Sequence, residues 1–166
     1  MDIDRLFSDK EYVENEIKFF ITKKHIKKIN TNTELVNAHL KKARHNLEFY
    51  NLNKEHEKFN DWLIVTLYYS LYHIALALIT NKKYASKNHY ATIIILIKEY
   101  AITKDEARLL NELSISKEDA ELYTSLKGDR HDASYATNIK FTQETIKEYE
   151  EKILDFVNKS EELLQN

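Results

Sequence analysis

The sequence has 166 residues, of which 43% are apolar and 31% charged, with a formal net charge of −2. This composition is typical of one globular domain that buries a core, and it excludes a disordered chain and a uniformly basic nucleic-acid-binding protein. The absence of cysteine excludes disulfides, thiolate nucleophiles and cysteine-based zinc sites. The chain shows neither the basic start and apolar run of a signal peptide nor a membrane-length apolar run, so we expect a cytoplasmic protein outside any membrane.

The chain has no proline and one glycine, which predicts long helices ended by caps and polar loops. A capping box at 8–11 (SDKE) begins a predicted helix over about 9–28. A second box at 31–34 begins a helix that continues to about Tyr50. The polar run at 51–60 is the next predicted loop.

The next segment is apolar on nearly every side. Asp61 caps a predicted helix over 61–79 that must be surrounded by other helices, which makes it the central one. A loop is expected at 80–87. The run at 89–101 contains β-branched residues that a buried strand would also show, but we predict a helix because no other segment offers a strand partner.

Three further helices complete the chain. A capping box at 103–106 begins a short helix through about Leu113, a second starts near Ser116, and Thr142 caps the last one, whose apolar residues form a stripe. Neither a strand nor a repeat stands out. The sequence therefore predicts an all-α protein, an antiparallel up-and-down helical bundle that forms one domain over 1–166.

Several kinds of site are excluded by the residues present. A single glycine excludes a phosphate-binding P-loop and a dinucleotide fingerprint, and Glu-x-x-His and His-Glu-x-x-His are absent. His39 and His45 are six residues apart and lie on different helix faces, so we expect neither a metal site nor a cofactor. We interpret His73, on the central helix, as a core histidine with a hydrogen-bonded partner.

The decapeptide at 127–136, KGDRHDASYA, gathers charged and aromatic groups around the only glycine. An arginine such as Arg130 can make two bonds to a phosphate, and a histidine such as His131 can transfer protons near neutral pH. Tyr135 can stack on a base, and Lys127 adds a cation. The alternative stays open that this is a polar turn, with Arg130 paired to a neighbouring carboxylate and the glycine ending a helix.

Two segments of the chain together resemble the HEPN family of small helical domains. The first is LYYSLYHIALALI at 67–79, similar to the family's central helix, and it is followed by Lys87-Asn88-His89, similar to the basic-x-His opening of the next helix. The second is LKGDRHDASYA at 126–136, which matches an Arg-x-x-Ala-x-Tyr pattern of one prokaryotic branch, with Ser134 where that branch usually has aspartate.

The resemblance covers about residues 33–164 and implies a HEPN-like four-helix core with extra short helices, while 1–30 is an added N-terminal helical extension. It implies a homodimer whose polar motifs face one another across a cleft and bind RNA or a nucleotide. Many members are metal-independent endoribonucleases of toxin–antitoxin or defence systems that use an arginine and a histidine separated by four to six residues.

In this chain the three positions at that spacing from Arg130 are Tyr135, Ala136 and Thr137, and the nearest histidine is the adjacent His131. The predicted catalytic pair is therefore Arg130 and His131, and the predicted RNA or nucleotide ligands are Lys127, Arg130 and Tyr135. One alternative is a non-catalytic regulatory module partnered with a nucleotidyltransferase, which in some family members modifies a tyrosine of this motif. Another alternative is a helical interaction scaffold.

Basic clusters occur at 23–28 (KKHIKK), 41–45 (KKARH) and 82–83. Each offers cations to RNA phosphates, but in a chain of net negative charge a solvated helix face is the default interpretation. A basic patch formed in a dimer would change that balance.

Overall fold

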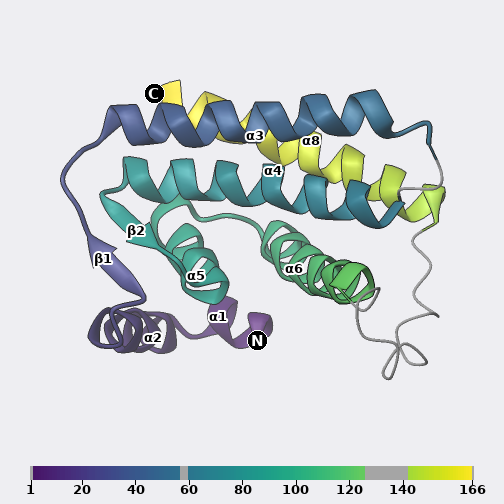
Figure 1. Cartoon of the computed structure of the whole chain (residues 1–166). Coiled ribbons are helices and arrows are strands. Elements are labelled where there is room, and N and C mark those ends of the chain that lie inside the picture. Colours follow the sequence, from purple (N-terminus) through teal and green to yellow (C-terminus); the bar gives the residue numbers. More distant parts are fainter. Residues whose placement is uncertain (1, 57–59, 126–141, 166) are drawn as a thin grey trace.

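A computed structural model describes residues 2–56, 60–125 and 142–165, with residues 115–125 described by their backbone (Figure 1). Within these ranges the protein is all-α apart from one small two-stranded sheet, as the sequence predicted. The elements are α1 (Ile3–Ser8), α2 (Lys10–Thr22), β1 (Ile26–Lys28), α3 (Thr33–Asn53), α4 (Asn60–Asn81), β2 (Tyr84–Ser86), α5 (His89–Tyr100), α6 (Lys104–Ser125) and α8 (Gln143–Gln165).

Helix α4 is the centre of the fold, as its apolar sequence predicted. It packs against α3 and α8 on one side and α5 and α6 on the other (Figure 1). Most of its side chains are buried, among them Leu63, Ile64, Ala77 and Ile79, which are fully buried. By length and composition α4 could also cross a membrane, but 78% of its apolar window is buried inside the protein, as in the core helix of a globular domain.

The contacts between helices fix their directions. Ser70 on α4 donates to the carbonyl oxygen of Ala43 on α3 at 3.0 Å, and these two helices run antiparallel (Figure 1). Helix α8 also runs antiparallel to α3, because Arg44 binds Glu161 near the end of α8, while Tyr50, further along α3, binds Glu150 nearer the start of α8. Helix α3 is therefore antiparallel to both α4 and α8, and α8 runs parallel to α4.

The N-terminal region differs from the single predicted helix over 9–28. Asp9, and not Ser8, caps α2 by accepting the N–H of Tyr12 at 2.9 Å, while the Ser8 hydroxyl donates to the carbonyl of Asp4. The helix ends at Thr22 because the chain turns through a positive φ of 60° at Lys24.

The expectation that no strand forms was wrong. Strand β1 pairs antiparallel with β2, with Ile26 opposite Ser86 and Lys28 opposite Tyr84. Each strand has three residues, too few to show an alternating pattern, and the partner lies far away in the sequence.

Two other helix boundaries also differ from the prediction. The capping box at 103–106 forms, with the N–H of Thr103 donating to Glu106 at 2.6 Å and that of Glu106 donating to the Thr103 hydroxyl at 3.2 Å. The helix that it begins, α6, continues to Ser125 as one element where two short helices were expected. Helix α3 is capped by Asn32 and extends three residues beyond Tyr50.

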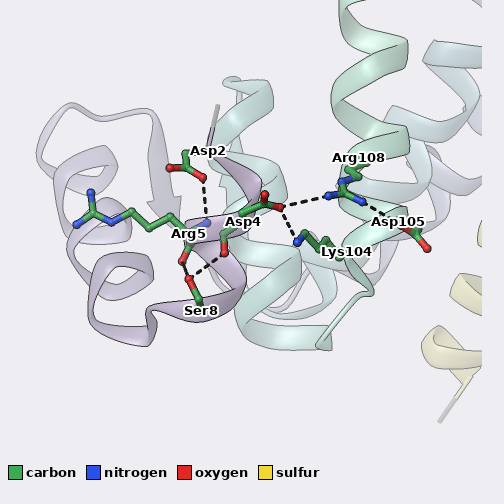
Figure 2. A network of polar contacts seen from close by, with 7 residues as sticks. All are labelled: Asp2, Asp4, Arg5, Ser8, Lys104, Asp105 and Arg108. Carbon is green, nitrogen blue, oxygen red and sulfur yellow. Dashed lines mark hydrogen bonds and ion pairs between the residues drawn. The ribbon is translucent and has the colours of Figure 1, made fainter.

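The N-terminal helices belong to the same core as the bundle. Leu6, Val13, Ile17 and Phe20 are buried and join the main hydrophobic cluster. At the surface the carboxylate of Asp4 binds Lys104 at 2.6 Å and Arg108 at 3.3 Å, which fastens α1 to the start of α6 (Figure 2). The hydrogen bond with Lys104, and then its charge, lower the pKa of Asp4.

Candidate functional site

The residues predicted to form the site lie outside the described part of the chain. Lys127, Arg130, His131 and Tyr135 all fall within 126–141, between the end of α6 and the start of α8. Their predicted roles as catalytic pair and as RNA or nucleotide ligands therefore remain predictions. The structure describes the two helices that flank them in the sequence, α6 and α8, and the surfaces of the other described residues.

The chain re-enters the described structure at a well-capped helix start. The hydroxyl of Thr142 accepts the N–H of Thr145 at 3.1 Å, as the capping prediction required. The next residue, Gln143, donates through its side chain to Asn60 at 3.0 Å, which attaches the start of α8 to the start of α4. The returning end of the decapeptide segment is thus held by rigid elements.

Beside this end of α8 lies a groove of about 560 Å³ between α3 and α8. It is lined by Tyr50, Lys54, Glu55, Gln143, Glu144, Lys147 and Glu150. Glu150 accepts hydrogen bonds from the Tyr50 hydroxyl at 3.0 Å and from Lys54 at 2.8 Å. Burial, and then the neighbouring Glu150, raise the pKa of Tyr50. Three carboxylates face two lysines, so this groove by itself does not favour an anion.

The two segments that resemble the central helix and the basic-x-His opening lie in contact. The rings of Tyr68 and Tyr72 stack at 5.6 Å, and the ring of His89 lies 5.9 Å from the first and 5.7 Å from the second. Asn88 begins α5 by accepting the N–H of Ala91 at 2.8 Å, and this cap sets the position of His89. Tyr68 is buried, so this aromatic set is part of the core.

A pair of histidines joins α3 to α4. The Nδ1 atoms of His39 and His73 lie 3.1 Å apart, so one ring donates its N–H to the other. Burial lowers the pKa of His39. Burial, followed by the charges of His39 and Lys42, lowers the pKa of His73 to about 4. Both rings are therefore neutral at pH 7, and the expectation that His73 has a hydrogen-bonded partner is confirmed.

This pair was not visible in the sequence, since its members come from different helices. Two imidazole nitrogens are metal ligands in principle, but no third histidine, cysteine or carboxylate joins them within the described ranges. The arrangement is that of a neutral, hydrogen-bonded pair within a helix seam.

Next to the same seam, three large apolar side chains are exposed. Phe49 and Leu52 of α3 and Trp62 of α4 have 45%, 79% and 50% of their surface exposed. Phe49 and Trp62, with Asn53 and Leu63, line a shallow cavity of about 400 Å³. We call Phe49, Leu52 and Trp62 the apolar patch.

Two of the three basic clusters come together. In the β1–β2 pairing Lys28, the last residue of the cluster at 23–28, lies opposite Tyr84, which follows the cluster at 82–83. The N–H of Ile29 also donates to the carbonyl of Lys83 at 2.9 Å. The third cluster, 41–45, lies separately on α3.

Comparison with protein-family models, with curated proteins and with solved structures finds no match to this chain. The HEPN resemblance therefore rests on three stretches of the sequence, at 67–79, 87–89 and 126–136. Two of these motifs, the central helix and Lys87-Asn88-His89, have described positions, and the third falls within 126–141.

Proposed function

We propose that this protein is a HEPN-like helical protein that binds RNA or a nucleotide through the decapeptide at 127–136. Lys127 and Arg130 bind phosphate, and Tyr135 stacks on a base. The observation that carries the proposal is the contact of His89 with Tyr68 and Tyr72. Two motifs of the resemblance, distinct in the sequence, pack against one another at the centre of the fold.

The flanking structure supports a ligand-binding role for the decapeptide. Binding residues are often carried by a loop that a rigid scaffold holds at both ends. Here the segment leaves from α6 and returns at Thr142, whose cap begins a helix joined to α4 through Gln143 and Asn60. The helix at which the segment returns, α8, is therefore joined to the central helix α4.

The proposed activity is metal-independent RNA cleavage. Arg130 holds the scissile phosphate, and His131 removes or returns a proton at the reacting oxygens. Such a site is completed in a homodimer, and the apolar patch supports one, since exposed aromatic side chains of this size are typical of a protein interface.

A second candidate is favoured by one observation in the sequence. The positions where active HEPN-like nucleases carry a histidine hold Tyr135, Ala136 and Thr137. This favours a non-catalytic module that binds RNA or a nucleotide and is modified on Tyr135 by a partner nucleotidyltransferase. An added nucleotidyl mass on the purified protein, lost in Tyr135→Phe, would support this candidate.

Cleavage is tested by incubating the protein with mixed RNA in the presence of EDTA, beside Arg130→Ala and His131→Ala. Arg44→Ala is the matched control, because it removes an arginine from the described surface of α3. The proposal of a nuclease expects cleavage by the wild type and the control and none by Arg130→Ala. If none of these proteins cleaves RNA, the proposal of a nuclease is refuted. If Arg130→Ala also binds RNA as tightly as the wild type, the proposal that the decapeptide binds RNA is refuted as well.

A further inference from the structure

Seven exposed lysines gather around the small sheet at one end of the molecule. They come from the end of α2, from β1, from the turn after α4 and from the residue that follows β2. We call them the lysine surface: Lys23, Lys24, Lys27, Lys28, Lys82, Lys83 and Lys87.

The backbone explains why these lysines meet. In β1 the side chain of Ile26 is buried, while Lys27 and Lys28 are exposed. The N–H of Ile29 donates to the carbonyl of Lys83 at 2.9 Å, which joins the turn after α4 to the end of β1 (Figure 1). The sheet therefore combines basic segments that are far apart in the sequence.

Two of these lysines occupy positions that favour another residue. Lys24 and Lys83 have φ values of 60° and 64°, in the left-handed region that glycine and asparagine adopt most readily. Each ends a helix at a turn that glycine would satisfy without a side chain. Lysine at both turns is unfavourable for the backbone and adds positive charge to the same surface.

The lysine surface lies in stretches of the chain that are free of acidic residues, although Glu99 and Glu14 approach Tyr84 of the sheet from neighbouring helices. The sequence contains no aspartate or glutamate over 17–33 or over 62–98, which include all seven lysines. The ion pairs of the described ranges use other lysines: Lys54, Lys98, Lys104 and Lys159. A protein with a net charge of −2 therefore carries a locally cationic face.

An aromatic ring lies within this cationic face. The ring of Phe19 is 50% exposed, and the Nζ atom of Lys23 lies 5.7 Å from its centroid. Exposed aromatic rings among cations are the usual platform for unpaired bases, because the base stacks on the ring while the cations bind the backbone.

We propose that the lysine surface binds the sugar–phosphate backbone of single-stranded RNA, with Phe19 stacking on a base. The choice of RNA rests on the proposed function, but the surface itself is separate from the decapeptide. Charge complementarity selects a polyanion, and the aromatic platform selects a nucleic acid whose bases are unpaired. The surface would hold the strand while the decapeptide acts on it.

The test measures the affinity for a fluorescent oligouridylate at several salt concentrations. The variant Lys27→Gln/Lys28→Gln/Lys83→Asn removes three cations of the lysine surface. The control Lys10→Gln/Lys41→Gln/Lys152→Gln removes three exposed lysines from α2, α3 and α8 and makes the same change in net charge. Circular dichroism confirms that both fold.

The first variant is expected to bind RNA at least tenfold more weakly at low salt. The slope of log affinity against log salt should fall by about 2, at about 0.7 for each lost contact with a single strand. Phe19→Ala should weaken binding with the slope unchanged, and Phe19→Tyr should restore it. Equal affinities and slopes for the two triple variants would overturn the proposal.

Two further arms separate this surface from the decapeptide and from a membrane. If Arg130→Ala loses RNA cleavage or RNA binding while the lysine variant binds oligouridylate as its control does, the proposal for the lysine surface is refuted and that for the decapeptide stands. If the lysine variant alone loses affinity, the surface stands without the decapeptide. Binding to phosphatidylserine vesicles that depends on these lysines, without binding to oligouridylate, would assign the surface to a membrane and overturn the proposal.

Discussion

The histidine pair between α3 and α4 should make the protein less stable at mildly acidic pH. His39 and His73 share one hydrogen bond at 3.1 Å as neutral rings. Burial, and then the neighbouring His39 and Lys42, lower the pKa of His73 from 6.5 to about 4. His73 therefore binds a proton more readily in the unfolded chain than in the folded protein. As a result, the unfolding free energy decreases as the pH falls from 6.5 towards 4.

The size of this effect follows from the two pKa values. Lowering the pH from 7 to 5 would cost about 2 kcal/mol of unfolding free energy if the whole pKa difference applied. Because His73 is half-buried, solvent screens part of this cost, and we expect about 1 kcal/mol. Replacement of the ring in His73→Gln removes the group that titrates.

Urea unfolding at pH 7 and at pH 5 measures this difference for the wild type, His73→Gln and the control His45→Gln, which changes an exposed histidine of the same helix as His39. The loss of stability between the two pH values should be about 1 kcal/mol smaller in His73→Gln than in the other two proteins. Equal losses in all three proteins would refute a neutral, half-buried pair.

Four other predictions concern the helices and the apolar patch. Leu71→Ala, at a fully buried position of α4, should lower the unfolding free energy by about 2–5 kcal/mol in urea titrations, whereas Leu52→Ala should change it by less than about 0.5. Thr103→Ala should cost about 1 kcal/mol by the same assay, since it breaks the capping box. Burial opposes ionisation of Glu106, but bonds from Lys159 and Thr103 lower its pKa below 4.5. Ionised Glu106 therefore stabilises the fold, and this contribution is lost as the pH falls below 4.5. Glu106→Gln lacks the contribution, so in urea titrations it should lose less unfolding free energy than the wild type below that pH. If the apolar patch joins two copies, Trp62→Lys should sediment as a monomer where the wild type sediments as a dimer.

Much of the fold could be predicted from local patterns. The apolar circumference of 61–79 identified the central helix, because only a helix covered on every side tolerates such a sequence. The capping groups at Thr103 and Thr142 begin α6 and α8 as predicted. These signals are local: a cap and its partner lie three residues apart.

The predictions were wrong where a local sequence pattern fitted two structures, or where the contact that decides the structure is made by a residue far away in the sequence. Ser8 and Asp9 are both good capping residues, and the choice between them depended on the short helix α1, which ends at Ser8. Strand β1 exists because β2 is available to pair with it, and three residues give too little pattern to reveal either strand.

The candidate sites show the same division. The prediction for 127–136 falls outside the described residues, and the nearest described elements are α6, which ends at Ser125, and α8, which Thr142 caps. The pairing of His39 with His73 depends on how α3 packs against α4, so no spacing within one helix could show it. The lysine surface likewise needs the β1–β2 contact, although the long stretches without acidic residues were a signal in the sequence.

The central claim, that the decapeptide is the RNA or nucleotide site, is tested most directly by photocrosslinking. RNA that contains 4-thiouridine is bound, irradiated and digested, and the protein is cleaved with trypsin. The proposal predicts a crosslink in the peptide spanning residues 131–140, which carries His131 and Tyr135. In Arg130→Ala, where trypsin no longer cleaves at position 130, it predicts that the corresponding peptide 128–140 carries no crosslink. Crosslinks to bound RNA that spare this peptide and occur only elsewhere would contradict the claim.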